Sequence, residues 1–387
     1  MNQERYYWLA WSRIAGVGPV LLKRIHQQFE TLENAWKATE KALLQVNGLG
    51  QKLSASIIEQ RSRLDPEAFF AEHLQKNPQF WTPADADYPR LLWEIPSPPP
   101  VLYYKGQVIT AENQGHFPGI GMVGTRSPTE HGARWTRKLS IGLAKSGFTI
   151  ISGLAAGIDG EAHRSCLQIG GRTIAVLGTG LDLIYPPHHA SLFQEIAEKG
   201  LILSEYAVGT KPERGNFPAR NRIIAGLSRA VLVMEAPEQS GALITAKYAN
   251  EFGRDVYTLP NSPDVQEAKG CLTLIHRGAE VIITEEKLLE NLGAIPQLDA
   301  IEQLSLLTAS PDALDNSPPS QSSVNPAIES LDALSQQIWA VVTPTPIPLD
   351  NIIARTGLSV GEVSGTLLQL ELLGLVKQLP GMHYQRC

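Results

Sequence analysis

The chain has 387 residues, 43% of them hydrophobic and 19% charged, and a formal net charge of −6. This length exceeds what one hydrophobic core usually serves, so we expect two or three domains. No run approaches the roughly 20 apolar residues of a spanning helix, and the three cysteines form neither a CxxC pair nor a disulfide framework, so we expect a cytoplasmic protein without a membrane segment or a structural zinc site.

The negative charge is unevenly distributed along the chain. Residues 284–332 contain nine acidic residues and one lysine, so the remainder is close to neutral. Residues 211–229 carry five basic residues against one acidic residue. Because binding of a polyanion depends on the local field, this basic patch allows a nucleic-acid partner in spite of the net charge.

Residues 1–82 are predicted to form a helical domain. Two similar stretches, RIAGVGPVLLKRI and QVNGLGQKLSASI, each place a Gly-x-Gly turn before an amphipathic helix. This spacing resembles SAM-like helix-hairpin-helix elements, whose turn amides can hold a phosphate. Pro19 removes one candidate amide, so we favour a structural helical module, with phosphate binding as the alternative.

Residues 83–290 alternate short apolar runs with segments of helical periodicity. The runs GIGMVG, FTIIS, RTIAVLG, LILSEY, AVLVMEA, DVYTLP and AEVIIT predict strands. The alternation predicts an α/β domain with a largely parallel, doubly wound sheet and helices on both faces. Ligands of such sheets bind beyond the carboxyl ends of the strands, so we expect the function in the loops that follow the strands.

The run GIGMVG also satisfies the G-x-G-x-x-G pattern of dinucleotide-binding loops. Here the glycines lie within the strand, whereas the dinucleotide pattern follows a strand. The next strand ends in Ser152-Gly153 rather than in an acidic residue that could bind a ribose hydroxyl. We therefore predict no NAD binding and no other cofactor.

The loop GTRSPTE follows the first strand of this domain. Ser127 is the predicted N-cap of the next helix, Pro128 its first residue and Glu130 the partner in a capping box. Three residues then remain at the carboxyl end of the strand: Gly124, Thr125 and Arg126. The glycine permits close approach, and the threonine and arginine can bind a phosphate; the alternative is a tight turn with an exposed arginine.

Two later loops repeat this chemistry. ISGLAAGID places Ser152 and Gly153 after a strand, and APEQSGALITA does the same with Ser240 and Gly241. Such small residues leave room for a ligand and expose backbone N–H groups. One loop of this kind is usually explained by packing, but three at one edge of a sheet predict a groove.

Asp159 and His163 lie four residues apart in a predicted helix and can face each other. A metal site needs further ligands, and none has a suitable spacing. We therefore predict a buried, hydrogen-bonded His–Asp pair and no metal. The sequence also lacks a nucleophile elbow, a P-loop and an H-E-x-x-H helix, so we predict a protein that is not an enzyme.

The segment KPERGNFPARNR predicts a helix that begins at Pro218 and buries Ile223 and Ile224. Arg220 lies on the same inward face, where a cation opposes the positive end of the helix dipole. We interpret the anion that stabilises this arginine as a phosphate backbone. The alternative is a carboxylate such as Glu205 or Glu235, because buried arginines are normally paired.

The same segment contains several groups that suit an unpaired strand. Its candidate phosphate ligands are Arg214, Arg220, Asn221 and Arg222. The ring of Phe217 offers a stacking face to a base. Cations combined with aromatic faces are typical of grooves for single-stranded nucleic acids.

Residues 291–330 are acidic, rich in proline and serine and poor in aromatic residues, which predicts a flexible linker. Residues 331–387 resemble a winged helix, with a helix, a glycine turn, a long helix and a short hairpin. The expected recognition helix, from Ser359 to about Leu373, contains two glutamates and no lysine or arginine. We therefore favour contact of this domain with a protein over contact with DNA.

Six segments together resemble the DprA/Smf family of DNA-processing proteins: MVGTRSPTEHG, TIISGLAAGIDGEAH, IAVLGTGLDLIYPP, SEYAVGTKPERGNFPARNRIIAGLS, LVMEAPEQSGALITA and LIHRGAEVI. The resemblance covers residues 85–284 in order. It implies an extended Rossmann-like domain that binds single-stranded DNA without strong sequence preference, forms a homodimer, protects incoming strands in natural transformation and helps to load the RecA recombinase. It also implies binding positions at Gly124, Thr125, Arg126, Arg214, Phe217 and Arg220.

Two segments depart from the family pattern. Pro260-Asn261 stands where members often have Pro-Gly, and KGCLTLI replaces an Asn-bearing stretch, so the resemblance implies no role for that loop. The predicted nucleic-acid site comprises twelve residues: Gly124, Thr125, Arg126, Ser152, Gly153, Arg214, Phe217, Arg220, Asn221, Arg222, Ser240 and Gly241. The alternative function is a nucleotide-processing enzyme similar to the LOG-type phosphoribohydrolases, whose PGG-x-GT signature has its nearest approach here in VLGTG.

Overall fold

The structure is a computed structural model that describes residues 3–293, 333–343, 347–356, 358, 360–372, 375–379 and 383–386. The chain divides into two compact units, residues 1–308 and 309–387. The predicted linker falls outside the described residues, apart from 291–293. Among the described helices, none has the length and apolarity that a membrane span requires.

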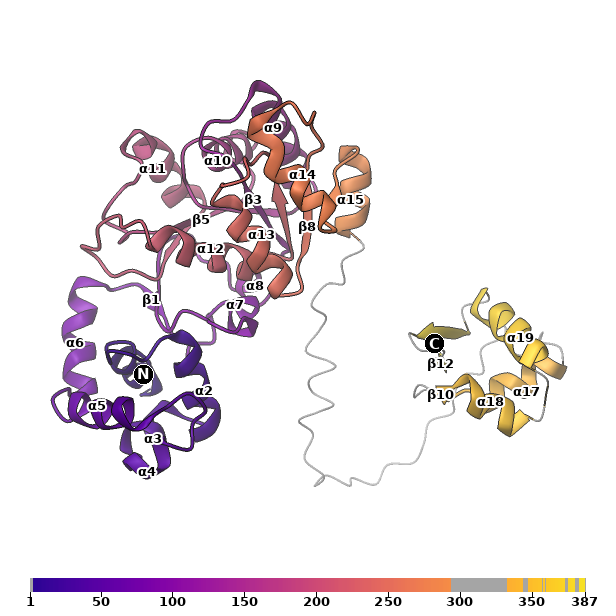
Figure 1. The fold of residues 1–387 in the computed structure, drawn as a ribbon, viewed down its shortest axis with the longest axis horizontal. Coiled ribbons are helices and arrows are strands. Elements are labelled where there is room, and N and C mark those ends of the chain that lie inside the picture. The colour runs from indigo at the N-terminus through magenta and orange to yellow at the C-terminus, as the bar shows by residue number, and fades with distance from the viewer. Residues whose placement is uncertain are drawn as a thin grey trace. The chain divides into compact units, whose positions relative to one another are not determined.

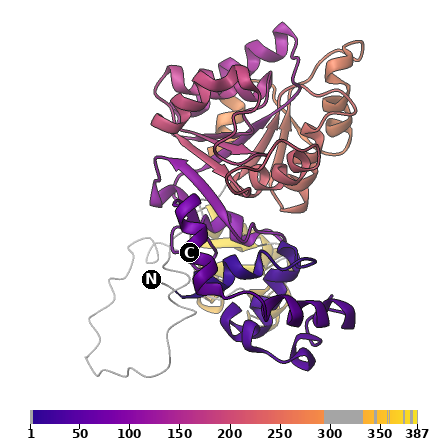
Figure 2. The same ribbon diagram turned by 90° about the vertical axis from the view of Figure 1, so that its left-hand side faces the viewer.

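The first unit begins with a group of helices that appear together in indigo and purple in Figures 1 and 2: α1 (Glu4–Trp11), α2 (Pro19–Phe29), α3 (Leu32–Lys37), α4 (Glu40–Leu43), α5 (Gln51–Arg61) and α6 (Pro66–Lys76). The two Gly-x-Gly turns precede α2 and α5, with Gly18 and Gly50 as N-caps. Buried side chains such as Trp8, Trp11 and Leu22 form the core of this helical part.

A nine-stranded sheet follows, made of β1 (Phe80–Trp81), β2 (Leu102–Gly106), β3 (Gly119–Val123), β4 (Thr149–Ser152), β5 (Thr173–Leu177), β6 (Leu201–Ser204), β7 (Ala230–Val233), β8 (Asp255–Thr258) and β9 (Glu280–Val281). The strand order is β1-β2-β6-β5-β4-β3-β7-β8-β9. All seven predicted runs form strands, β3 to β9, and these pair in parallel. β1 and β2 were not predicted; they extend the sheet beyond β6 by antiparallel pairing.

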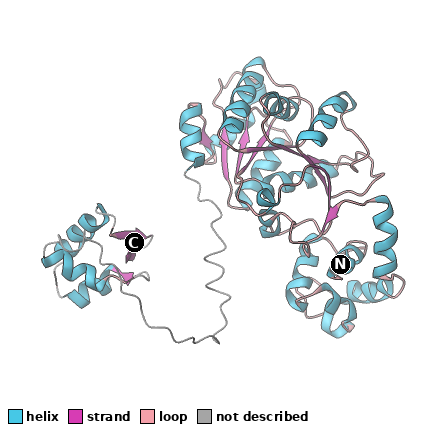
Figure 3. Ribbon diagram, turned by 180° about the vertical axis from the view of Figure 1, so that it is seen from behind, coloured by secondary structure: helices cyan, strands magenta, loops and turns pink. Residues whose placement is uncertain are grey.

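Helices cover both faces of the sheet, as the doubly wound prediction requires (Figure 3). The helices of this part of the chain are α7 (Arg90–Glu94), α8 (Thr110–Asn113), α9 (Glu130–Lys145), α10 (Ile158–Gln168), α11 (Ala190–Lys199), α12 (Asn216–Leu227), α13 (Ala242–Glu251), α14 (Lys269–His276) and α15 (Glu285–Gly293), with the short 3-10 helices η1 (Pro187–His189) and η2 (Gln266–Ala268). On one face α7, α12 and α13 pack against side chains such as Val231 and Val233. On the other face α9, α10 and α15 pack against the alternate residues, such as Leu232. Successive side chains of a buried strand therefore point into two different cores, one on each face of the sheet.

The strand order reverses between β3 and β7. The chain runs from β3 outward through β4, β5 and β6, then returns to place β7 on the other side of β3. Connections that leave β3 and β7 therefore diverge to opposite faces. The crevice between them, at the carboxyl ends of the strands, is the usual ligand position in such sheets.

The second unit contains α17 (Ala333–Val341), β10 (Ile347–Pro348), α18 (Leu349–Thr356), α19 (Val360–Leu372), β11 (Val376–Leu379) and β12 (His383–Arg386). Its three strands form an antiparallel sheet in the order β10-β12-β11. Buried residues including Ile338, Leu367 and Val376 form its own core. Three helices and a β-hairpin in this order confirm the predicted winged-helix fold.

Candidate functional site

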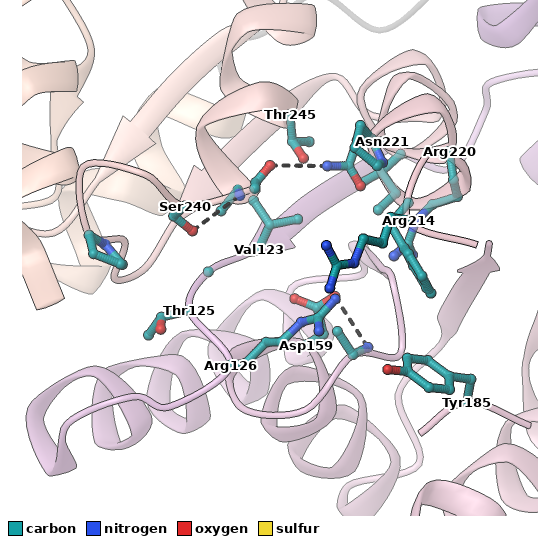
Figure 4. A pocket seen from close by; sticks show the side chains of 18 residues that line it. Val123, Thr125, Arg126, Asp159, Tyr185, Arg214, Arg220, Asn221, Ser240 and Thr245 are labelled. Carbon is teal, nitrogen blue, oxygen red and sulfur yellow. Dashed lines mark hydrogen bonds between the residues drawn. The ribbon is translucent and has the colours of Figure 1, made fainter. Parts of the chain in front are cut away.

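A pocket of about 660 Å³ lies at the carboxyl ends of the strands, at the point where the strand order reverses. We call it the arginine pocket (Figure 4). It is lined by Val123, Gly124, Thr125, Arg126, Ala155, Asp159, Tyr185, Arg214, Phe217, Pro218, Arg220, Asn221, Ile224, Pro237, Ser240, Gly241, Ala242 and Thr245. Nine of the twelve residues predicted from the sequence are therefore brought together here; Ser152, Gly153 and Arg222 do not line the pocket.

The loop after β3 is held in place by backbone hydrogen bonds to two other elements. The amide of Thr125 donates to the carbonyl oxygen of Glu235 at 2.7 Å, and the amide of Ile158 donates to the carbonyl oxygen of Thr125 at 3.1 Å. The loop is thus fixed between the end of β7 and the first turn of α10. Arg126 follows directly, with an exposed side chain at the mouth of the pocket.

The predicted N-cap of α9 is wrong by two residues. The N-cap is Thr129, whose hydroxyl oxygen accepts from the amide of Gly132 at 3.2 Å. The carboxylate of Glu235, rather than Glu130, completes the cap, because it accepts from the amide and the hydroxyl of Thr129 at 2.7 and 2.6 Å. The carboxylate of Glu235, just after β7, therefore takes the place that the predicted capping box gave to Glu130.

Helix α12 begins at Asn216, two residues earlier than predicted, so Pro218 lies within its first turn. Proline is tolerated there because the first amides of a helix have no partner within it. Arg220 is only 4% exposed, as its inward position predicted. Its guanidinium donates to the carbonyl oxygen of Val176, and among the described residues its Nε has no hydrogen-bond partner.

Burial lowers the pKa of Arg220 to about 10, while the charge of Asp159 acts in the opposite direction. Burial also raises the pKa of Asp159, an effect that Arg220 opposes. The arginine remains a cation at neutral pH. Its buried positive charge lines the pocket, and the nearby charge of Asp159 neutralises it only in part.

The two carboxylates considered as alternative partners of Arg220 are engaged elsewhere. Glu205 forms a bidentate pair with Arg222, at 2.8 and 2.7 Å, and Glu235 caps α9. Arg222 also donates its Nε to the carbonyl oxygen of Ser97 at 3.0 Å. The structure thus corrects the predicted position of Arg222: it points away from the pocket because its donors are used inside the protein, and it is left out of the proposed interface.

Ser152 and Gly153 lie behind Arg220 rather than in the pocket. The buried hydroxyl of Ser152 donates to the carbonyl oxygen of Met122 at 2.6 Å, and the amide of Gly153 donates to Asp159 at 3.1 Å. A methyl group on Gly153 would overlap the guanidinium of Arg220. These small residues therefore make room for the arginine, a reason different from the predicted contact with a ligand.

The predicted pair between Asp159 and His163 does not form. Asp159 accepts from the amides of Gly153 and Ala155, and His163 shares a hydrogen bond of 2.7 Å with the hydroxyl of Thr173. The two side chains lie on one helix, but tertiary contacts turn each toward a different partner. In the described part of the chain, no group of three or more His, Cys, Asp or Glu side chains could hold a metal ion.

An aromatic group forms one side of the pocket. The ring of Phe217 is half-buried, with the guanidinium carbon of Arg126 5.7 Å from its centroid and the ring of Tyr185 5.5 Å away at an angle of 40°. Tyr185 was missed by the sequence analysis, because the segment LIYPP has no pattern that marks a ligand contact. Thr245 was also missed; its buried hydroxyl has no partner among the described residues.

The exposed cations of the pocket are Arg126 and Arg214, whose side chains reach toward one another in Figure 4. Within the described ranges, neither forms an ion pair with a carboxylate. With Arg220 they bring three guanidinium groups to a pocket that contains one carboxylate, Asp159. The arrangement is suited to a ligand with more than one negative charge.

Comparison with known proteins agrees with this architecture. The family model described as DNA recombination-mediator protein A matches residues 79–293, the DprA winged helix domain matches 322–382, and a SAM-like helix-hairpin-helix tandem matches 12–62. The relative named Protein Smf from Synechocystis sp. is 63% identical over 396 residues, 100% of this chain and 99% of the relative. The chain belongs to the DprA/Smf family.

Two solved structures of DprA proteins resemble this chain. DprA from Streptococcus pneumoniae has a TM-score of 0.65 at 36% identity and covers 74% of this chain and 97% of its own. DNA processing protein A from Helicobacter pylori, described for its single-stranded DNA binding mode, has a TM-score of 0.50 at 32% identity and covers 55% and 95%. The predicted Rossmann-like fold and the DprA/Smf resemblance are therefore confirmed.

Proposed function

We propose that the arginine pocket binds single-stranded DNA. The observation that carries this proposal is the convergence of Arg126, Arg214 and Arg220 with the half-buried ring of Phe217 at one edge of the sheet. The description of the Helicobacter pylori relative, which concerns single-stranded DNA binding, supports it.

The chemistry of the pocket favours an unpaired strand over a duplex. Exposed guanidinium groups attract phosphates by charge, and an aromatic ring stacks on any base because every base has a π-face. A duplex hides those faces within its stack. The pocket therefore suits binding with little sequence preference and without catalysis.

The wider role that we propose follows the family resemblance. The chain would act in the cytoplasm as a homodimer, protect incoming single strands during DNA uptake and transformation, and help to load the RecA recombinase onto them. The names of the curated relatives, which include DNA processing protein DprA from Streptococcus pneumoniae, support a function in DNA processing. Contacts with RecA and between two copies belong to this proposal.

Binding of a fluorescent oligothymidine over a salt series tests the proposed interface. Arg126→Ala and Arg214→Ala should each weaken binding and lower the slope of log K against log salt by about 0.7, the value for one lost phosphate contact. Phe217→Ala should cost about 1–3 kcal/mol of binding free energy through the loss of one stacked base. Phe217→Leu, which keeps an apolar side chain of similar size, should show the same loss if stacking is the cause.

Arg63→Ala is a matched control, because Arg63 is an exposed arginine just after the end of α5 that pairs with Glu59 of that helix. The proposal fails if the three alanine variants of the pocket bind single strands as this control does. Release of a free base from a mononucleotide by the wild-type protein would instead support the phosphoribohydrolase alternative.

A further inference from the structure

A second pocket, of about 250 Å³, lies where the segment after α6 meets strand β2 and the loops after β5 and β6. We call it the tyrosine pocket. It is lined by Lys76, Asn77, Pro78, Gln79, Tyr103, Tyr104, Lys105, Leu181, Asp182, Tyr206 and Val208. None of these residues was predicted to contact a ligand, because they come from four separate parts of the sequence.

Three tyrosines line the pocket, and neighbouring contacts hold each of them in place. The hydroxyl of Tyr103 shares a hydrogen bond of 2.9 Å with His73, and the ring of Tyr104 stacks on Trp81 with centroids 4.1 Å apart. The hydroxyl of Tyr206 donates to the carbonyl oxygen of Asn216 at 3.4 Å. Aromatic surface of this kind suits a flat, weakly polar group such as a nucleobase.

Backbone amides engage the polar acceptors in this pocket. The side-chain oxygen of Asn77 accepts from the amide of Val208 at 2.9 Å, which joins the end of α6 to the loop after β6. The carboxylate of Asp182 accepts from the amide of Gly209 at 3.0 and 3.1 Å. The one acidic side chain of the lining is therefore used to hold a turn.

Two lysines give the rim a positive charge. Lys105 is exposed, with its ammonium group 5.4 Å from the ring centroid of Phe193, and in the part of the chain that the structure describes it forms no ion pair. Lys76 is also exposed and makes only a long contact, 3.7 Å, with Glu72 on its own helix. Exposed pairs of this kind are weak, so both lysines are available to an anion.

The tyrosine pocket and the arginine pocket are lined by different residues of the same two loops. In the loop after β5, Asp182 lines the tyrosine pocket and Tyr185 lines the arginine pocket. In the loop after β6, Tyr206 lines the tyrosine pocket and Arg214 lines the arginine pocket. Since consecutive Cα atoms are about 3.8 Å apart, Asp182 and Tyr185 are separated by at most roughly 11 Å. A strand that leaves one pocket can enter the other within a few nucleotides.

We propose that the tyrosine pocket is a second subsite for the same single strand, in which an unpaired base packs against the partly exposed Tyr104 and Tyr206 while flanking phosphates contact Lys76 and Lys105. This inference rests on the proposed function and extends it. The helical N-terminal part then contributes to DNA binding through the end of α6, and a bound strand runs along the sheet edge from β3 toward β2. An apolar side chain of a partner protein is the competing occupant, and the lysines and the shared loops favour the strand.

Strand length separates the two subsites experimentally. Anisotropy of labelled oligothymidines, from the shortest that binds to about 20 nucleotides, is measured for the wild type and for Lys76→Ala/Lys105→Ala. Long strands should bind this variant about tenfold more weakly, with a salt slope smaller by about 0.7 per lysine. The shortest strands, which fill only the arginine pocket, should bind it as they bind the wild type.

Lys37→Ala/Lys145→Ala is the matched control. It removes two exposed lysines, one of which, Lys37, pairs with a glutamate on its own helix as Lys76 does. Equal affinities of the two double variants at every length would overturn the second subsite. An equal loss for short and long strands would also overturn it, since the lysines would then act only through the general field.

Photo-crosslinking provides a second, independent readout with wild-type protein. Long oligothymidines that carry one 5-iododeoxyuridine are irradiated, and the attached peptides are identified by mass spectrometry. The proposal expects attachment to residues 103–105 or 206–208 at some positions of the label. Attachment confined to the arginine pocket contradicts the second subsite and leaves the proposed function intact, whereas that function fails if Arg126→Ala and Arg214→Ala leave binding unchanged at all lengths.

Discussion

At the scale of single residues, four arginines near the pocket have different environments. Arg126 and Arg214 are exposed, whereas Arg220 and Arg222 are buried on the same helix. Two positions on a helix differ by about 200° in direction, so Arg220 points toward the strand ends and Arg222 toward Glu205. The residue type predicts a cation, and the position of the residue around the helix axis decides which partner its side chain contacts.

This difference predicts that Arg222 matters for stability rather than for DNA contact. Arg222→Ala leaves Glu205 as a largely buried charge without its partner, which typically costs about 3–5 kcal/mol of unfolding free energy. Urea denaturation followed by circular dichroism measures the change. Arg137→Ala, which breaks a half-exposed pair with Glu161, should cost no more than about 1 kcal/mol. A stable Arg222→Ala protein with weakened DNA binding would instead make Arg222 a direct contact.

At the scale of elements, the site depends on how closely the loop after β3 approaches the start of α10. Gly157, the N-cap of α10, has a φ of +78°, and a methyl group on it would lie 2.6 Å from the carbonyl carbon of Arg126. Only glycine allows this approach, because the obstacle is backbone that cannot rotate away. The position of Arg126 at the pocket mouth therefore depends on a residue of another element.

Gly157→Ala should reduce both stability and affinity for single strands. The left-handed backbone alone costs a non-glycine residue about 1–2 kcal/mol, and the contact with the loop adds to this and displaces Arg126. Gly170→Ala is the control, since Gly170 has a φ of +72° but open space around it. The control should lose stability only, as measured by denaturation and anisotropy. Equal affinities of the two variants would show that the loop does not need this contact.

At the scale of the whole molecule, the sheet domain buries several ionisable groups in two cores. His163 is fully buried between α10 and the sheet, and burial lowers its pKa to about 3, with His189 acting in the same direction. Burial also lowers the pKa of His189 and of His26 in the helical part. The folded protein thus keeps these imidazoles neutral in conditions where the unfolded chain would protonate them.

This burial predicts acid sensitivity. For His163 the folded-state pKa lies below the ordinary value of 6.5, so the unfolded chain binds more protons between about pH 3 and 6.5. The unfolding free energy therefore falls as the pH decreases through this window, by up to about 1.4 kcal/mol per pH unit for one group. In His163→Gln the slope of unfolding free energy against pH should be shallower than in the wild type and in His188→Gln, an exposed control. An unchanged slope would contradict this assignment.

The sequence by itself determined the modules and the seven parallel strands, because amphipathic helices and buried strands are patterns within short windows. It also located nine of the pocket residues, since strand-following loops of a parallel sheet meet at one edge. Only the tertiary structure decided that Glu235 caps α9 across 106 residues and that Arg222 forms an ion pair with Glu205. It also decided that β2 pairs with β6, which brings β2 to the tyrosine pocket. These features depend on contacts between residues far apart in the chain, whose partners are chosen by packing of the whole domain and leave no mark in the local pattern.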